Sequence, residues 1–201
     1  MSVLVVGAGG HAKVVVATLQ ALGHAVTGVL EDGPAGMAVL GVPVVGPTDR
    51  LQGYVGPAVL AIGSNRVRQR LAEAYPGTEW LTLVHPAATV HVSVELGAGT
   101  VVFAGTVLQP DVAVGRHAIV NTGATVDHDG RVGDFAHVAP GAHLSGAVTV
   151  GEGALVGVGA CAAPGVSVGA WGVVGAGAAV LHDLPPNVTS VGAPAAPVVR
   201  T

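Results

Sequence analysis

The stretch VNTGATVDHDGRVGDFAHVAPGAHLSGAVTVGEGALVGVGA, residues 120–160, decides the fold. Within it a Val or Leu returns at every sixth residue, and this spacing runs without an insertion from Val84 to Val180, with only Ala162 departing from it. A period of six fits neither the helical period of about 3.6 residues nor a simple strand alternation. It fits a chain that turns a corner every six residues and points one aliphatic side chain inward on each flat face. The repeat therefore predicts a prism-shaped coil.

Small residues complete the repeat. Glycine often follows the aliphatic residue, as at Gly97, Gly115 and Gly133, and the fifth position is usually small, as at Ala118 and Ala136. The chain holds 32 glycines and only 3% aromatic residues, although half of it is hydrophobic. Such a core has to be assembled from small aliphatic side chains placed repetitively, because large aromatic side chains are scarce.

Composition excludes several classes of function. The chain of 201 residues carries 8 basic and 12 acidic residues without a basic run, so nucleic acid is not an expected partner. Glycines interrupt every long apolar stretch and no signal segment is visible. We therefore expect a cytoplasmic protein that does not associate with a membrane. The single Cys161 cannot form an intrachain disulfide and is expected to serve in packing.

Residues 1–80 follow another pattern, in which strands alternate with helices. Residues 3–7, 25–30 and 57–63 are predicted strands, and residues 11–23 and 65–75 are predicted helices. This order predicts a small, Rossmann-like parallel sheet.

A glycine loop follows the first predicted strand. In VVGAGGHAKVV, residues 5–15, Gly7, Gly9 and Ala12 fit the phosphate-binding pattern G-x-G-x-x-G/A. Only one mononucleotide half fits before the repeat begins, so a full dinucleotide fold is not expected. Glu31 and Asp32 follow at about the distance at which an acidic residue meets a ribose or base. The loop is therefore predicted to bind a nucleoside phosphate.

One histidine stands out as a candidate general base. His128 lies between Asp127 and Asp129, in a repeat whose other residues are almost all small and uncharged. A neighbouring carboxylate orients an imidazole and raises its basicity. In contrast, His85, His91 and His117 are expected to be simply exposed on the prism.

The whole chain resembles the family of sialic-acid O-acetyltransferases and bacterial UDP-amino-sugar N-acetyltransferases, which includes the bacillosamine- and perosamine-pathway enzymes. The motifs that carry the resemblance are VVGAGGHAKVV, VLEDG, AIGSNRVRQRL, LVHPAATV, residues 120–160 and SVGAPAAPV. The resemblance implies a left-handed parallel β-helix over residues 81–183, a nucleotide-sugar-binding unit over residues 1–80, and a tail, residues 184–201, that contributes to a coenzyme A site.

The resemblance also implies roles for individual residues. His128 matches the family's general base and Asp129 the acidic residue beside it. His137 matches a histidine near the acetyl group of acetyl-CoA, Gly146 would offer a backbone N–H at the thioester, and Val158 is assigned to the same coenzyme A site. The implied substrate-binding residues are Gly9, Gly10, His11, Glu31, Asp32, Gly63, Ser64, Asn65 and Asn121. For Asn121 a structural role at a buried corner is an equal alternative.

The expected activity is transfer of an acetyl group from acetyl-CoA to the amino group of a nucleotide-linked 4-amino sugar, by direct attack and without a metal. A homotrimer is expected, since a flat-sided prism packs well around a threefold axis. Three alternatives remain. One is O-acetylation of sialic acid or another sugar hydroxyl. The second is a zinc site like that of γ-class carbonic anhydrases, which the spacing of His137 and His143 does not favour. The third is a non-enzymatic scaffold.

Overall fold

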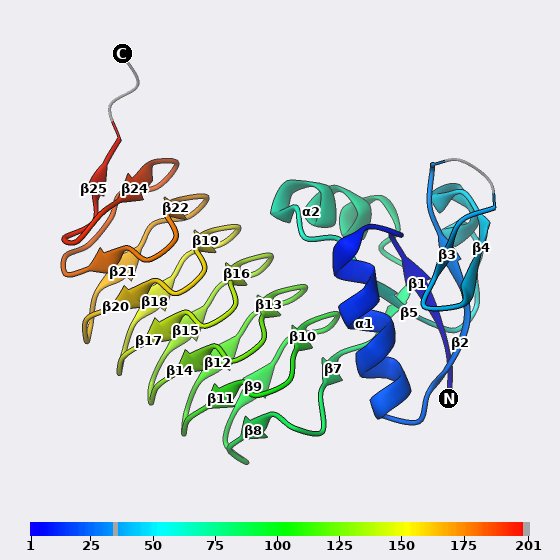
Figure 1. Ribbon diagram of the computed structural model, residues 1–201, viewed down its shortest axis with the longest axis horizontal. Coiled ribbons are helices and arrows are strands. Elements are labelled where there is room, and N and C mark those ends of the chain that lie inside the picture. The colour runs from blue at the N-terminus through cyan, green and yellow to red at the C-terminus, as the bar shows by residue number, and fades with distance from the viewer. Residues whose placement is uncertain (34–35, 199–201) are drawn as a thin grey trace.

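The structure, a computed structural model that describes residues 1–33 and 36–198, consists of an α/β unit and a parallel β-helix (Figure 1). The α/β unit is built on a six-stranded sheet with the strand order β3-β4-β2-β1-β5-β6. Its strands β1, β2, β4, β5 and β6 are parallel, and β3 pairs antiparallel with β4. The fold class expected from the sequence is confirmed.

The elements of the α/β unit lie close to the predicted ranges. They are β1 (Ser2–Val6), α1 (Gly10–Ala21), β2 (Ala25–Leu30), β3 (Ala38–Val39), β4 (Val42–Gly46), the 3-10 helix η1 (Thr48–Leu51), β5 (Pro57–Leu60), α2 (Asn65–Ala74) and β6 (Glu79–Trp80). The strands β3, β4 and β6 and the helix η1 were not predicted. Strands β3 and β6 have two residues each, and β4 contains Pro43, which is unfavourable inside a strand.

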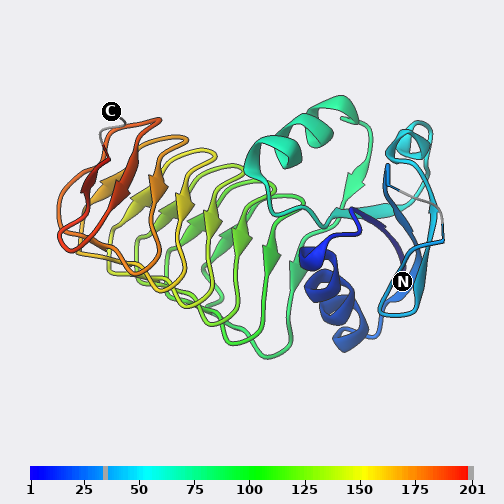
Figure 2. The same ribbon diagram turned by 45° about the horizontal axis from the view of Figure 1, so that its top comes forward.

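The β-helix has three flat faces, and the chain passes from the first to the second to the third in each coil (Figure 2). The first face contains β7 (Leu83–Val84), β10 (Val101–Val102), β13 (Ile119–Val120), β16 (His137–Val138), β19 (Leu155–Val156), β22 (Val173–Val174), β24 (Thr189–Val191) and β25 (Ala196–Pro197). The second face contains β8 (Thr89–Val90), β11 (Val107–Leu108), β14 (Thr125–Val126), β17 (His143–Leu144), β20 (Cys161–Ala162) and β23 (Ala179–Val180). The third face contains β9 (Glu95–Leu96), β12 (Ala113–Val114), β15 (Arg131–Val132), β18 (Thr149–Val150) and β21 (Ser167–Val168).

Each two-residue strand points one side chain inward and one outward, because side chains alternate along a strand. The inward residue is the aliphatic one of the repeat: Val120, Val126 and Val132 are all buried in one coil. The small residues Ala118 and Ala136 are fully buried with them. The core of the prism is therefore a stack of Val, Leu and Ala side chains, as the repeat predicts.

One corner of the prism is made of glycines for a steric reason. At the corner that leads from the third face to the first, an added β-carbon at Gly97, Gly115 or Gly151 would lie 2.5 Å from a backbone nitrogen of the next coil. Real β-carbons essentially never approach another atom that closely. Glycine at this place in the repeat lets successive coils stack at their hydrogen-bonding distance.

Helix α1 lies between the sheet of the α/β unit and the first face of the β-helix. Its residues Ala12, Val15, Val16 and Leu19 are fully buried, and they share one apolar cluster with Val3 and Val5 of β1 and with Leu83, Val101, Phe103 and Ile119 of the β-helix. The outward residues of the first face are apolar where α1 covers them. The two units therefore have one continuous core.

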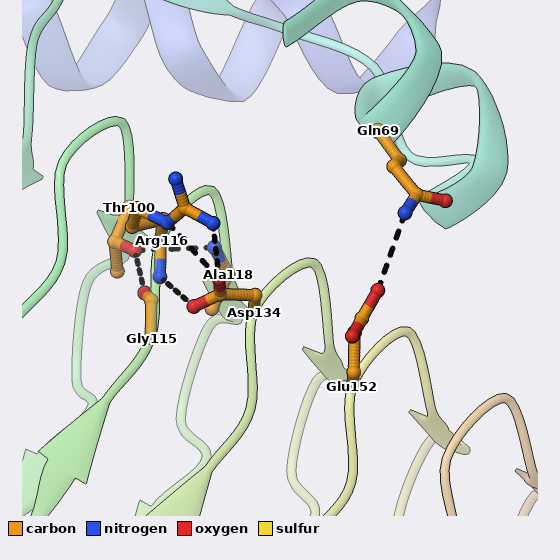
Figure 3. A network of polar contacts seen from close by, with 7 residues as sticks. All are labelled: Gln69, Thr100, Gly115, Arg116, Ala118, Asp134 and Glu152. Atoms are coloured by element: carbon orange, nitrogen blue, oxygen red, sulfur yellow. Dashed lines mark hydrogen bonds and ion pairs between the residues drawn. The ribbon is translucent and has the colours of Figure 1, made fainter. Parts of the chain in front are cut away.

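Helix α2 lies along the corner between the third and first faces (Figure 2). Asn65 Nδ2 donates to the carbonyl of Gly153 at 3.0 Å, the Arg66 guanidinium lies 4.3 Å from the ring centroid of Trp171, and Gln69 donates to Glu152 at 3.2 Å. Figure 3 shows Gln69 reaching from α2 to Glu152, and the ion pair of Arg116 with Asp134 on neighbouring coils of the same corner, at 2.8 Å. Helix α2 thus meets this corner through polar contacts as well as through Ala72, which shares an apolar cluster with Phe135, whereas α1 meets the first face through apolar side chains.

Two expectations from the sequence are wrong. His117 is not exposed: only 5% of it is accessible, because its ring stacks on Phe135 and meets Trp80 edge-on, and the α/β unit covers it. Cys161 is not a packing residue: it is the outward residue of its strand, and its side chain is exposed on the second face. The six-residue period fixes the inward position but not which outward residues another unit covers.

The tail continues the β-helix. Strand β24 pairs in parallel with β22 on the first face, and β25 pairs antiparallel with β24. Within residues 1–33 and 36–198, no helix is long and apolar enough to cross a membrane.

Candidate active site

His128 lies at the corner between the second and third faces, after β14 and before β15. Its Nδ1 forms a hydrogen bond of 2.8 Å with Asp129 Oδ2, and both side chains are exposed. Asp127 contacts the same residue differently, because its Oδ1 accepts the backbone N–H of His128 at 2.8 Å. Of the two neighbouring carboxylates, Asp129 is the one that orients the ring.

The backbone explains how Asp129 reaches the ring. Asp129 has a φ of +59°, in the left-handed region that Asp tolerates better than most residues. The pKa of His128 is raised above its ordinary value, first by the hydrogen bond that Nδ1–H donates to Asp129 and then by the negative charge of Asp127. The arrangement leaves Nε2 as the basic atom of a ring whose Nδ1 is held by a carboxylate.

Gly146 occupies the same place on the next coil and lies directly against His128. A β-carbon on Gly146 would be 2.5 Å from Nε2 and 2.6 Å from Cε1 of the ring. Gly146 is itself buried. The imidazole therefore rests on a glycine backbone, as expected for residues eighteen apart in this repeat.

A second cluster lies where the first face meets the start of α1. Asn121 Nδ2 lies 3.0 Å from His137 Nε2, and Asn121 Oδ1 accepts the backbone N–H of Thr122 at 2.8 Å. An amide NH₂ group can only donate, so Nε2 of His137 accepts and its proton is on Nδ1. The backbone of Gly63 forms a further hydrogen bond with His137. The contact with Gly63 joins the α/β unit to the β-helix.

The second cluster contains neutral histidines. Burial is the first cause that lowers the pKa of His11 to about 4 and that of His137 to about 3, and the charge of Arg68 is the second. The two rings are 6.3 Å apart, and the His11 ring meets Phe103 edge-on. His11 and His137 are therefore uncharged at neutral pH.

The glycine loop connects β1 to α1. Gly7 has a φ of +108°, and a β-carbon there would lie 2.8 Å from Ile62, so the loop passes close to the end of β5. Gly9 and Gly10 are exposed, with open space around both. No acidic residue stands in the first turn of α1, so the positive end of the helix dipole faces the loop.

The acidic pair after β2 forms contacts within the unit. Glu31 accepts the backbone N–H of Ala8 at 2.7 Å, and Asp32 accepts the backbone N–H of Thr48 at 2.8 Å. The carboxylate of Asp32 stays exposed beside a groove lined by Glu31, Gly33, Gly36 and residues 44–47. Glu31 thus shapes the glycine loop, and Asp32 borders the adjacent groove.

The remaining candidates are more dispersed. Gly63 and Ser64 are exposed at the start of α2, whereas the amide of Asn65 is already engaged with Gly153 and Arg68. Val158 is 56% exposed, at a corner between the first and second faces.

Within one chain the two clusters lie on different parts of the prism. His128, Asp129 and Gly146 are at the second-to-third corner, and Asn121, His137, His11 and Gly63 are at the first face. Sequence reasoning missed Arg68, which touches the second cluster. No local signal marks Arg68, because it stands between Arg66 and Arg70 on a helix, where arginine is normally exposed.

Known proteins match this chain over its full length. The model of the PglD N-terminal domain family matches residues 2–75. The chain is 43% identical to perosamine N-acetyltransferase from Caulobacter crescentus, with a TM-score of 0.94, and the match covers 100% of this chain and 98% of that one. The chain belongs to the bacterial amino-sugar N-acetyltransferase family.

Other members of this N-acetyltransferase family are similar over the same span. The acetyltransferase domain of PglB from Neisseria gonorrhoeae is 40% identical, with a TM-score of 0.94, over 98% of this chain and 99% of that one. WeeI from Acinetobacter baumannii is 26% identical, with a TM-score of 0.89, over 98% of this chain and 100% of that one. Among curated proteins, an uncharacterized protein of Acanthamoeba polyphaga mimivirus is 28% identical over 101 residues, which are half of this chain and 21% of that protein.

The perosamine N-acetyltransferase structure contains CoA and GDP-perosamine, and a second PglB structure contains acetyl coenzyme A. The described part of the chain has no group of three His, Cys, Asp or Glu side chains that could hold a metal ion.

Proposed function

We propose that the protein transfers an acetyl group from acetyl-CoA to the amino group of a nucleotide-linked 4-amino sugar. The observation that carries the proposal is the exposed imidazole of His128, held at Nδ1 by Asp129 at 2.8 Å and resting with Nε2 against Gly146. This is the arrangement of an oriented general base with a free basic nitrogen. The similarity to perosamine N-acetyltransferase along the whole chain supports the same reaction class.

The proposed reaction needs no covalent enzyme intermediate. The sugar amine attacks the thioester carbon while Nε2 of His128 takes a proton from the amine, and Asp129 stabilises the imidazolium that forms. A backbone N–H at Gly146 would face the oxyanion of the tetrahedral intermediate. When this intermediate collapses, the C–S bond breaks, and the proton on Nε2 passes to the departing thiolate to give free coenzyme A.

The nucleotide part is proposed to bind at the glycine loop. The open backbone at Gly9 and Gly10 and the uncompensated N-terminus of α1 suit a diphosphate. The groove beside Glu31 and Asp32 suits the ribose and base. Gly63, Ser64 and Asn121 then lie on the path from this loop toward the β-helix.

The acyl site is proposed to form between two copies of the chain. In one prism His128 is at the corner between the second and third faces and His137 is on the first face, so a neighbouring prism has to bring one cluster to the other. This arrangement supports a homotrimer with three composite sites, in which coenzyme A lies between adjacent prisms near Val158 and the tail, of which residues 199–201 lie outside the described residues. The cytoplasmic location remains a prediction.

Release of free coenzyme A from acetyl-CoA tests the proposal. A thiol-reactive dye would report turnover with UDP- and GDP-linked 4-amino sugars, with free sialic acid as the comparison acceptor. Turnover with a nucleotide-linked amino sugar is expected, and the preferred acceptor shows whether the sugar nucleotide carries uracil or guanine. Activity on sialic acid alone would replace the proposal with O-acetylation, and no thiol release with any acceptor would contradict it.

A further inference from the structure

Arg68 is a buried cation that forms no ion pair within the described residues. Only 1% of the residue is accessible. Its Nε donates to the carbonyl of His117 at 2.7 Å and its Nη2 to the carbonyl of Phe135 at 2.6 Å. Its Nη1 donates to the carbonyl of Ile62 at 3.0 Å, and Nη2 also donates to Asn65 Oδ1 at 3.0 Å. Carbonyl dipoles and one amide, rather than a carboxylate, surround the charge.

This arrangement is expensive for stability alone. Burying a charge without a counter-ion is unfavourable, and an apolar residue of similar volume commonly stabilises such a position equally well. Burial lowers the pKa of Arg68 to about 10, which still leaves it protonated at neutral pH. The planar fork of the guanidinium reaches several acceptors in fixed directions, which an apolar side chain cannot do and lysine does poorly.

The acceptors of Arg68 come from three separate segments. Ile62 and Asn65 flank the loop between β5 and α2, while His117 and Phe135 belong to successive coils of the β-helix. Two residues after Phe135 the chain reaches His137, whose ring contacts Asn121 and the backbone of Gly63. Arg68 therefore connects both sides of the second cluster.

We infer that Arg68 is a positioning residue for acetyl transfer, which fixes the loop 62–65 against the β-helix so that Gly63 and Asn121, beside His137, keep one arrangement around the acceptor sugar. This inference rests on the proposed function. The residues facing His137 are Arg68 from α2, His11 from α1 and Asn121 from the preceding coil. The charge of Arg68 also lowers the pKa of His11 and His137, which helps to keep both rings neutral.

Arg68→Lys and Arg68→Met test the inference, with Arg66→Met as the matched control. Arg66 is on the same helix and also cationic, but it is exposed and contacts only the Trp171 ring among the contacts described. Arg68→Lys keeps the charge and loses the fork. We expect its KM for the nucleotide sugar to rise at least about tenfold, with the KM for acetyl-CoA changed less than about twofold, because the loop 62–65 faces the acceptor. The control is expected to change neither KM.

Arg68→Met removes the charge. We expect the pKa of His137, followed by NMR of the ring, to rise toward its ordinary value in this variant and to stay low in Arg68→Lys. If Arg68→Met does not fold, Arg68→Lys alone decides. An unchanged KM for the nucleotide sugar in folded Arg68→Lys would overturn the inference. The inference would also fail if both KM values stayed intact and kcat fell only by the fraction of protein that is unfolded.

Hydrogen exchange of the backbone N–H of residue 68, which donates to the Ser64 carbonyl at 2.9 Å, separates this inference from the proposed function, because it needs no turnover. Faster exchange there in Arg68→Lys, with unchanged exchange in the β-helix core, is expected. Slow exchange as in the unmodified protein would overturn the positioning role even if the enzyme is active. An enzyme inactive on all nucleotide sugars, but with the expected exchange, would instead contradict the proposed substrate.

Discussion

Gly146 and His128 are one coil apart, and the imidazole lies where a β-carbon of Gly146 would be, 2.5 Å from Nε2. We predict that Gly146→Ala displaces the ring, since the backbone of the coil is fixed by the Gly165 N–H donating to the Gly146 carbonyl at 2.9 Å. A displacement on the order of 1 Å can reduce catalysis about 100-fold. The measurement is kcat/KM beside the melting temperature. Full activity would show that the ring position is not critical.

His128→Ala is expected to abolish most turnover without loss of stability. General bases contribute about 100- to 10,000-fold to rates, whereas this side chain is exposed and contributes little to packing. Steady-state kcat and thermal melting check both parts, and His91→Ala, another exposed corner histidine, serves as the control. Retention of activity in His128→Ala would contradict its role as base.

The pH dependence of kcat/KM should distinguish the two carboxylates beside His128. The base form is the neutral imidazole, so activity falls as the pH drops below the pKa of His128, which Asp129 raises most. Asp129→Asn should therefore lower that pKa, moving the acidic limb of the profile to lower pH while reducing the maximal rate. Asp127→Asn should shift the limb in the same direction but less. A larger shift from Asp127→Asn would reverse the assignment.

Folding stability should decline in acid because of the buried histidines. The pKa of His117 is lowered to about 4, chiefly by burial, as is that of His11. Below the ordinary value of about 6.5 the unfolded chain binds protons that the folded chain excludes, so the free energy of unfolding falls between about pH 6.5 and pH 4. Denaturant unfolding across this range measures the slope.

His117→Phe provides the specific test of that slope. Phenylalanine retains the stack on Phe135 and removes the titrating group, so the slope should decrease by about one proton. His91→Phe, at an exposed site, controls for the loss of a histidine and the gain of a phenylalanine. If His117→Phe and His91→Phe show the same slope of unfolding free energy against pH, the acid sensitivity does not come from His117.

The sequence predicts the β-helix well because its determinants are local. The aliphatic residues that recur every six positions from Val84 onward all point inward for the same reason, and a shift of one residue in strand register would turn all of them outward. The pair His128 and Asp129 was also predictable, because adjacent residues at one corner do not depend on any other unit. These inferences required no knowledge of how distant segments pack.

Contacts between the two units escaped sequence analysis. His117 occupies the same place in its hexapeptide as the exposed Asp111 and Asp129, and only the docked α/β unit makes it buried. Arg68 reaches carbonyls 49 and 67 residues away along the chain. A six-residue period carries no information about which outward positions a second unit covers.

Helix α1, held between the sheet and the first face, makes unfolding of the molecule cooperative across both units. Its apolar residues belong to a single cluster with Val5 on one side and Ile119 on the other, so neither unit opens without exposing the other. The chain has two tryptophans, Trp80 in the α/β unit and Trp171 in the β-helix. Trp80→Phe leaves Trp171 as the fluorescent reporter, and Trp171→Phe leaves Trp80. Both reporters should show the same denaturant midpoint, after each midpoint is corrected for the change in unfolding free energy that the substitution itself causes. The α/β unit and the β-helix are then gained and lost together, so a chain with only one of the two units folded does not accumulate.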